Sequence, residues 1–360
     1  MIIKTPKIYI SEKDAIQRAG KYIKGYTKKP LIIGSEKALD VAYPELKKSL
    51  EENGIDASNV DTFTGYPSEN KFSFYSELVL KYNADAIIGV GGGRVLDTAK
   101  ATADLLDIPV ITVPTIAATC AAWAGLTIQY DDEGSFVQAR PLKKAPEVII
   151  ADTKIILSAP KRYLFAGTID TFAKFFEIRP SLAHAKDSLN LDIAFYSAKL
   201  AYQKLEDNVF KALEEAKNDI YEQSAKDVVD AIIYLAGFAG SFQTNTGYYS
   251  FAHPFYHISA RFPNTRHKLH GEKVGYGILT QLLLEKKSEN EIAETIRNFS
   301  KYDNAFTLSD IGLNKENKNE LKNLASQIKE TFEHVEWSIE EIVEALVVTD
   351  LWVAKVKGDI

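Results

Sequence analysis

The stretch DAIIGVGGGRVLDTAKATADLL, residues 85–106, decides the fold class of this 360-residue chain. Its first part is an apolar run that ends in three consecutive glycines, which is typical of a strand buried on both faces in a parallel sheet. After the glycines, apolar residues recur at helical spacing from Val95 to Leu106. A buried strand that leads through glycines into an amphipathic helix predicts an α/β domain with a parallel, Rossmann-like sheet.

Neighbouring segments repeat this alternation over the first 158 residues. Continuous apolar runs that predict further strands occupy residues 30–34, 108–115 and 147–152. The segment YPELKKSLEENG predicts a helix that stops at Asn53 and Gly54. Residues 126–137 read instead as a hairpin, with its turn at residues 131–134. We therefore expect a nucleotide-binding α/β domain over residues 1–158.

The pattern changes after about residue 160, where helical periodicity replaces the strand-like runs. KDVVDAIIYLAGF, residues 226–238, carries apolar residues at helical spacing. Ser338 and Glu341 form a capping-box pattern before another apolar helix. Residues 159–360 are therefore expected to form an all-helical domain, the second of two domains that this chain length predicts.

Composition excludes several classes of partner. A net charge of −6 opposes binding to nucleic acid, because such proteins present basic surfaces to phosphates. No apolar run approaches the ~18 residues that a membrane-spanning helix needs, and the first residues lack a secretory pattern. A single cysteine, Cys120, excludes an internal disulfide and fits a reducing compartment. We expect a soluble, cytoplasmic protein.

The glycines Gly91, Gly92 and Gly93 would let backbone N–H groups approach a phosphate at a helix N-terminus. The motif departs from the usual dinucleotide fingerprint, since Arg94 stands where the third glycine is expected. A tight turn without a ligand is the alternative. The loop alone does not choose between them.

Residues 251–274 hold four of the six histidines, His253, His257, His267 and His270. Histidine is a frequent metal ligand, and catalytic sites of the zinc type take three protein ligands. Asp170, which precedes several phenylalanines, could supply the third ligand or merely cap a helix. Spacing leaves open whether these residues bind a metal.

The ordered segments GVGGGRVLDTAKA, VPTIAAT, AGTIDTFAKFFE, AHPFYH and LHGEKVGYG together resemble the iron-containing alcohol dehydrogenase superfamily, in its glycerol-dehydrogenase-like branch. The resemblance covers nearly the whole chain. It implies a metal-dependent NAD(P)-linked oxidoreductase, with the metal and the nicotinamide meeting in a cleft between an α/β domain and a helical domain. It also implies a homo-oligomer.

By this resemblance, the metal ligands are Asp170, His253 and His270, and His257 is a further catalytic candidate with a supporting or proton-relay role. Some relatives carry another histidine four residues after the aspartate, where this chain has Lys174. The three-ligand set favours zinc, with iron, nickel and manganese left open. The resemblance assigns the cofactor to Gly91, Gly92, Gly93, Asp97, Lys100, Thr115, Thr119 and Leu126.

Two positions concern specificity. Cys120 stands where glycerol dehydrogenases have an aspartate that helps to hold the polyol, and VPTIAATCAAW resembles hydroxycarboxylate dehydrogenases. A 2-oxo acid is therefore the expected substrate, with Lys174, Arg266 or Lys268 as candidates to bind its carboxylate. Glycerol with dihydroxyacetone is the alternative, and a dehydroquinate-synthase-like lyase is a remote one.

The second position follows the strand at residues 30–34. Ser35 replaces the acid that NAD-preferring relatives commonly have there, and Lys37 could pair with the 2′-phosphate of NADP. Glu36 opposes that preference. We therefore expect NADP, with NAD left open.

Overall fold

The computed structural model describes residues 3–184, 189–242 and 250–358. The chain forms two compact units: Met1–Leu164 with Gln203–Ser241, and Phe165–Tyr202 with Phe242–Ile360. This division differs from the boundary that the sequence predicts between residues 158 and 159. Residues 203–241 join the first unit because they pack on it: the Tyr9 hydroxyl donates to Asp230 over 2.8 Å, and the Trp123 and Tyr234 rings lie 5.1 Å apart.

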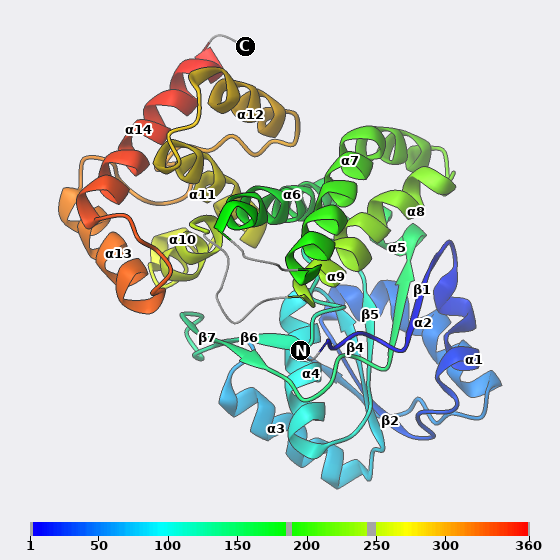
Figure 1. Cartoon of the computed structure of the whole chain (residues 1–360). Helices are drawn as coiled ribbons and strands as arrows, with labels where there is room; N and C mark the ends of the chain where they lie inside the picture. The colour runs from blue at the N-terminus through cyan, green and yellow to red at the C-terminus, as the bar shows by residue number, and fades with distance from the viewer. Residues whose placement is uncertain (1–2, 185–188, 243–249, 359–360) are drawn as a thin grey trace. The chain divides into compact units, whose positions relative to one another are not determined.

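The first unit is built on a six-stranded sheet with the order β1-β8-β5-β4-β2-β3 (Figure 1). All neighbouring strands are parallel. The strands are β1 (Ile8–Glu12), β2 (Pro30–Gly34), β3 (Val60–Thr62), β4 (Ala86–Gly91), β5 (Val110–Pro114) and β8 (Val148–Asp152). The expected strands are confirmed, whereas β1 and β3 were not foreseen.

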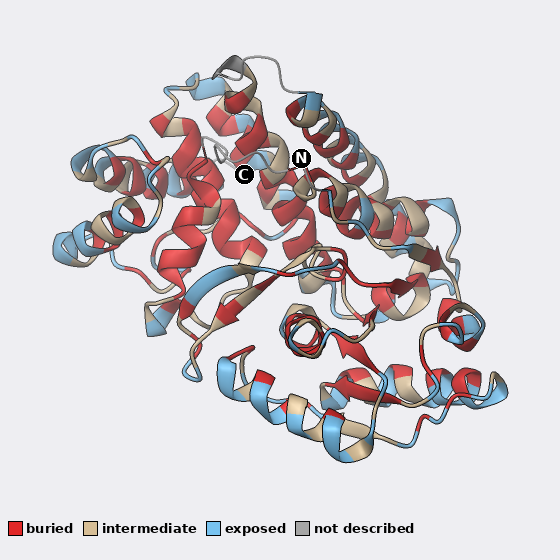
Figure 2. Ribbon diagram, turned by 60° about the horizontal axis from the view of Figure 1, so that its bottom comes forward, coloured by how far each residue is buried: buried red, intermediate tan, exposed pale blue. Residues whose placement is uncertain are grey.

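Helices cover both faces of this sheet. Alternate residues of a strand point to opposite faces, and in these strands both sets are apolar, so each face needs a cover. Ile32 and Ile88 pack in a core with α1 (Ala19–Ile23) and α2 (Glu36–Glu52). Leu31, Ile33 and Ile87 pack in a second core with α3 (Glu69–Tyr82) and α4 (Gly93–Leu106). The four strands β2, β4, β5 and β8 are therefore buried throughout (Figure 2).

The strand order reverses between β2 and β4, which marks the position where an open α/β sheet can bind a ligand. From β2 the chain passes through α2 to β3 at the edge, then through α3 back to β4 on the other side of β2. Ligands of open α/β sheets bind at the carboxyl ends of strands beside such a switch point. Those ends carry Gly34 and Gly91, followed by the N-termini of α2 and α4.

The remaining elements of the first unit complete its architecture. The expected hairpin is confirmed as β6 (Leu126–Tyr130) paired antiparallel with β7 (Phe136–Pro141). The others are η1 (Ala15–Arg18), α5 (Thr153–Ser158), α8 (Gln223–Asp230), the π-helical turn η2 (Ala231–Leu235) and α9 (Ala236–Gly240). Helix α7 (Leu189–Lys217) belongs to both units, since the division falls between Tyr202 and Gln203.

The second unit is helical over its described residues (Figure 1). It contains most of α6 (Lys161–His184), then α10 (Ala252–Ser259), η3 (Pro263–Thr265), α11 (His270–Leu284), α12 (Glu289–Lys301), α13 (Lys318–Thr331) and α14 (Ile339–Gly358). Phe255, Tyr276 and Leu346 lie in its core, where α10 and α14 pack on α11. The capping box is confirmed: the Ser338 N–H donates to Glu341 over 2.8 Å, and the Glu341 N–H donates to the Ser338 hydroxyl over 3.2 Å. Within the described ranges, none of the helices is both long and apolar enough to cross a membrane.

Candidate functional site

Asp170 lies on the buried side of α6, with Ile169, Phe172 and Ala173 around it in sequence. Its exposed fraction is 2 %. Helix α6 begins at Lys161, directly after Pro160, so Asp170 occupies the third turn of the helix. The alternative that Asp170 merely caps a helix is therefore wrong.

His270 is the first residue of α11, and its surroundings hold that helix end in place. The Glu272 carboxylate accepts a hydrogen bond from the Leu269 N–H over 2.8 Å, which fixes the first turn. Gly271 permits a close approach to α6, because a Cβ atom there would lie 1.8 Å from the Ala166 carbonyl oxygen. The imidazole therefore reaches Asp170.

Three side chains from three helices converge at this point. The Nε2 atom of His270 lies 2.8 Å from Asp170 Oδ1, and the Nε2 atom of His253, on α10, lies 3.4 Å from the same oxygen. The three candidate ligand atoms lie within 4.8 Å of one another. In the part of the chain that the structure describes, this is the single cluster of histidine, cysteine or acidic residues with such spacing.

The buried groups of this site change one another's pKa values. Burial raises the pKa of Asp170, but the charge of His270 and hydrogen bonds from both histidines outweigh it and hold that pKa well below its usual value. Burial lowers the pKa of His253, yet Glu177 and Asp170 raise it to about 9. Burial lowers the pKa of His270. One carboxylate with two imidazoles is a donor set that suits a divalent ion such as zinc and leaves a position open.

Glu177, which the sequence analysis missed, supports this cluster. It lies seven residues after Asp170 on α6, and its carboxylate accepts hydrogen bonds from the His253 N–H and ring Nδ1 over 2.9 and 2.5 Å. Burial raises its pKa, but the nearby His253 outweighs this and lowers it. The spacing of Asp170 and Glu177 could have indicated this role, since residues seven apart lie on the same face of a helix.

The other two histidines of residues 251–274, His257 and His267, lie outside the convergent set. His257 is buried, 6.3 Å from the His253 ring between centroids, and burial with the charges of His253 and His270 holds its pKa well below normal. It is not among the convergent ligand atoms, and its catalytic role stays a prediction. His267 is exposed, and its ring nitrogens lie 2.8 and 3.2 Å from the carbonyl oxygens of Asn264 and Asp310.

Lys174 follows Asp170 by one turn of α6 and is half-buried. Its positive charge helps to lower the pKa values of both Asp170 and Glu177, which places it electrostatically beside the cluster. Of the other two substrate candidates, Lys268 holds its ammonium 3.8 Å from the centre of the Phe306 ring, and Arg266 is half-buried. Of the three candidates, Lys174 is the one whose charge acts on Asp170 and Glu177, and its contact with a substrate stays a prediction.

The first unit presents the glycine loop as expected, at the N-terminus of α4. Gly92 is the N-cap, Gly93 is the first helical residue, and the first turn of α4 contains no acidic side chain. Gly91 has φ = 152°, a conformation that favours glycine, and a Cβ atom on Gly92 would lie 2.7 Å from Ile116. The helix end therefore offers backbone N–H groups to an anion.

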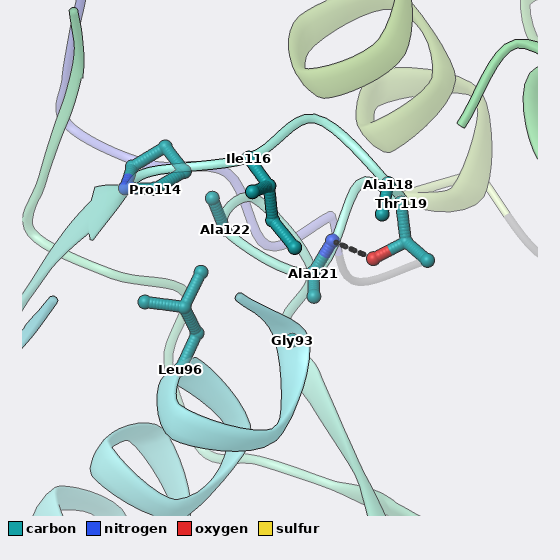
Figure 3. A pocket seen from close by; sticks show the side chains of 8 residues that line it. All are labelled: Gly93, Leu96, Pro114, Ile116, Ala118, Thr119, Ala121 and Ala122. Atoms are coloured by element: carbon teal, nitrogen blue, oxygen red, sulfur yellow. Dashed lines mark hydrogen bonds between the residues drawn. The ribbon is translucent and has the colours of Figure 1, made fainter. Parts of the chain in front are cut away.

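A small hollow adjoins Gly93 (Figure 3). Thr119 lines the hollow and accepts a hydrogen bond from the Ala121 N–H over 3.2 Å. Its lining residues are Gly93, Leu96, Pro114, Ile116, Ala118, Thr119, Ala121 and Ala122. The hollow is far smaller than the ~300 Å³ at which ligand pockets usually start, so by itself it cannot enclose a dinucleotide.

Lys100 holds the loop behind this hollow. Its ammonium donates to the carbonyl oxygens of Ala121, Ala124 and Leu126 over 2.6–3.1 Å and lies 3.0 Å from Asp97. The exposed fraction of the Lys100 side chain is 0 %. These contacts give Lys100 and Asp97 a structural role, while the cofactor contacts expected of them and of Leu126 stay predictions.

The remaining expected residues lie at strand ends and loops. The Thr115 N–H donates to the Gly91 carbonyl over 3.2 Å, which joins the loops after β5 and β4. Cys120 is half-buried, and its carbonyl accepts from the Trp123 N–H over 2.9 Å. Ser35 is the N-cap of α2, and Lys37 is exposed in the first turn.

Comparisons with known proteins agree with this arrangement. Residues 6–153 match the family model described as iron-containing alcohol dehydrogenase. The chain is 34 % identical over 299 residues to a glycerol dehydrogenase of Escherichia coli O6:H1, covering 82 % of this chain and 80 % of that one. It is also 34 % identical over 272 residues to hydroxycarboxylate dehydrogenase A of Escherichia coli K12, covering 74 % of each.

A solved structure shows the same fold. Glycerol dehydrogenase from Schizosaccharomyces pombe superimposes with a TM-score of 0.88 at 23 % identity, over 99 % of this chain and 92 % of the other.

Proposed function

Because this chain belongs to the iron-containing alcohol dehydrogenase family, we propose that it interconverts a small polyol and its carbonyl form, with glycerol and dihydroxyacetone as the lead pair. The chain is an NAD(P)-linked oxidoreductase that acts on alcohol groups. The convergence of Asp170, His253 and His270 carries the proposal. The glycerol dehydrogenases among its relatives support this substrate class.

We propose zinc as the ion that these three residues hold, because one carboxylate and two imidazoles form a three-ligand set and Lys174 supplies no fourth imidazole. When bound, such an ion polarises the oxygen of an alcohol or carbonyl and so favours hydride transfer to or from a nicotinamide. The protein's contribution is to keep Asp170 ionised and to aim both Nε2 atoms at one point.

The first unit is proposed to bind the cofactor through the N-terminus of α4. The N–H groups after Gly92 would receive the pyrophosphate, and the hollow lined by Leu96 and Ile116 would receive an adjoining part of the dinucleotide. Exposed Lys37 favours NADP and neighbouring Glu36 opposes it. Comparing the Kd values of NADPH and NADH in wild type and Lys37→Ala tests this preference. A variant that loses NADPH affinity alone supports NADP.

A 2-oxo acid is a second candidate, which Lys174 and Cys120 favour. Lys174 places a positive charge beside the metal ligands, where a substrate carboxylate would meet it. Cys120 removes a negative charge from a position where the resembled glycerol dehydrogenases have an aspartate. Hydroxycarboxylate dehydrogenase A lies within the same range of identity as the glycerol dehydrogenases.

Turnover of NADPH and NADH at 340 nm separates the two candidates. The zinc-loaded enzyme is tested with dihydroxyacetone and with 2-oxobutanoate. The ratio of the kcat/KM values for these two substrates is then compared between wild type and Lys174→Met. A wild-type preference for dihydroxyacetone that Lys174→Met leaves unchanged supports the polyol reading. A preference for the acid that falls at least tenfold in Lys174→Met supports the second reading, and Lys144→Met, an exposed lysine of the first unit, serves as the control.

Two further expectations remain predictions of this proposal, and one rival reading has its own test. A homo-oligomer is checked by light scattering, and a monomeric mass would contradict it. A cytoplasmic location is checked by fractionation of the source cells. The remote lyase alternative would show turnover without net oxidation or reduction of the cofactor, which the absorbance at 340 nm detects directly.

A further inference from the structure

The buried carboxylate of Glu177 contacts one metal-ligand candidate twice. Its Oε1 atom accepts the His253 backbone N–H over 2.9 Å, and its Oε2 atom lies 2.5 Å from His253 Nδ1. The first contact holds the backbone of α10 at that residue, and the second holds the ring. Both ends of His253 are therefore tied to α6.

The ring lies between two acids of the same helix. Its Nδ1 atom lies against Glu177, and its Nε2 atom lies 3.4 Å from Asp170 Oδ1. Asp170 and Glu177 are seven residues apart, which places them two turns apart on one face of α6. Helix α6 thus supplies one candidate ligand and also sets the direction of another.

This arrangement determines which ring nitrogen is available to a metal. An ionised carboxylate only accepts hydrogen bonds, so Nδ1 must carry the hydrogen in its contact with Glu177. In the neutral ring the lone pair then lies on Nε2, the atom that points toward Asp170. Metal-binding histidines are commonly oriented by such a carboxylate on the second nitrogen.

Core packing alone gives no reason for an acid at this position. Glu177 is 4 % exposed and stands between Phe176 and Ile178, which are also buried. A buried carboxylate is costly to desolvate, and an apolar side chain of similar size would commonly serve a core as well or better. The acid is explained by what it does to His253.

We propose that Glu177 is a positioning residue that sets the metal affinity of the site by fixing the tautomer and the direction of His253. This inference rests on the proposed metal-dependent function. It assigns Glu177 no contact with the metal, the substrate or the cofactor.

Zinc affinity, measured by competition with a chromophoric chelator, tests the proposal. Glu177→Gln preserves the shape and removes the charge, and outer carboxylates of this kind typically contribute about 10–100-fold to metal affinity. The matched control is Asp350→Asn, because Asp350 is as buried as Glu177. Its carboxylate accepts a hydrogen bond from the Leu308 backbone N–H over 2.7 Å and another from the Lys315 ammonium over 2.9 Å. We expect at least tenfold weaker zinc binding in Glu177→Gln and a change under twofold in Asp350→Asn.

The outcomes separate the inference from the function on which it rests. Zinc affinity in Glu177→Gln within threefold of wild type overturns the role of Glu177 and leaves the metal centre standing. An equal loss in both variants also overturns it, because the loss then reflects general destabilisation. If wild type itself binds no zinc above the level of Asp170→Ala, the metal centre fails as well.

A second measurement does not depend on the stability of the variant. Nitrogen-15 spectra of histidine-labelled, zinc-loaded wild type report which ring nitrogen of His253 carries hydrogen. The proposal predicts hydrogen on Nδ1 and zinc on Nε2. Zinc on Nδ1 would overturn it.

Discussion

Replacement of Lys100 by methionine tests whether this lysine holds the loop of residues 121–126 or contacts a cofactor. The side chain is fully buried, pairs with Asp97 at 3.0 Å and donates to three carbonyl oxygens. Methionine fills a similar volume without charge or donors. The Asp97 carboxylate, itself 9 % exposed, would lose its ionic partner.

The structure gives the expected size of the effect. Removing one partner of a buried ion pair costs about 3–5 kcal/mol, since the other charge stays buried. The carbonyls would add to this only in part, because each keeps a second lone pair and water can enter beside the loop. We therefore expect Lys100→Met to lower the free energy of unfolding of the first unit by about 4 kcal/mol.

Urea unfolding followed by circular dichroism and by Trp123 fluorescence measures this loss. Trp337 and Trp352, the two other tryptophans, lie in the second unit and are replaced by phenylalanine in all samples. Lys144→Met is the control, because its pair with Asp107 is more than 60 % exposed on both sides and such exposed pairs contribute little to stability. Wild-type stability in Lys100→Met, together with lost NADH binding, would refute the structural role and favour a cofactor contact.

Three further predictions concern the second unit. Burial lowers the pKa of Lys273 to about 7, so between pH 7 and 10 the unfolded chain binds more protons than the folded chain. The stability of wild type should therefore rise relative to that of Lys273→Met by about 1.4 kcal/mol per pH unit. A difference between the urea midpoints of the two proteins that stays the same at pH 7, 8 and 9 would contradict this. Ser338→Ala should lower the free energy of unfolding by about 1 kcal/mol, because the first turn of α14 loses a cap. The control is Ser326→Ala, which removes an exposed side-chain hydrogen bond to Glu330 but no cap. Gly271→Ala should force α11 away from Ala166 and weaken zinc binding, and a chelator competition curve equal to that of wild type would refute this reading.

Much of the fold was predictable because its signals are local. Strands β2, β4, β5 and β8 are buried on both faces, so each appears as a continuous apolar run. Hairpin and helix boundaries follow from turn residues and caps. Strand β3 was missed because it has only three residues, none of them buried, which leaves too short a pattern to detect.

Other features depend on tertiary contacts that no local pattern contains. Residues 203–241 belong to the first unit because Asp230 and Tyr234 meet Tyr9 and Trp123, far away in the sequence. The resemblance assigned the metal ligands, and the structure brings all three together. Glu177 was missed, since its role depends on the direction of the His253 ring.

Metal content tests the central claim most directly. Wild type, Asp170→Ala and His270→Ala are incubated with zinc, dialysed and measured by inductively coupled plasma mass spectrometry, with circular dichroism to confirm that each is folded. The cluster of Asp170, His253 and His270 predicts one zinc ion per wild-type chain and a loss of at least nine-tenths in either folded variant, an order-of-magnitude effect for removing one of three ligands. Equal zinc content in wild type and both variants would contradict the metal centre.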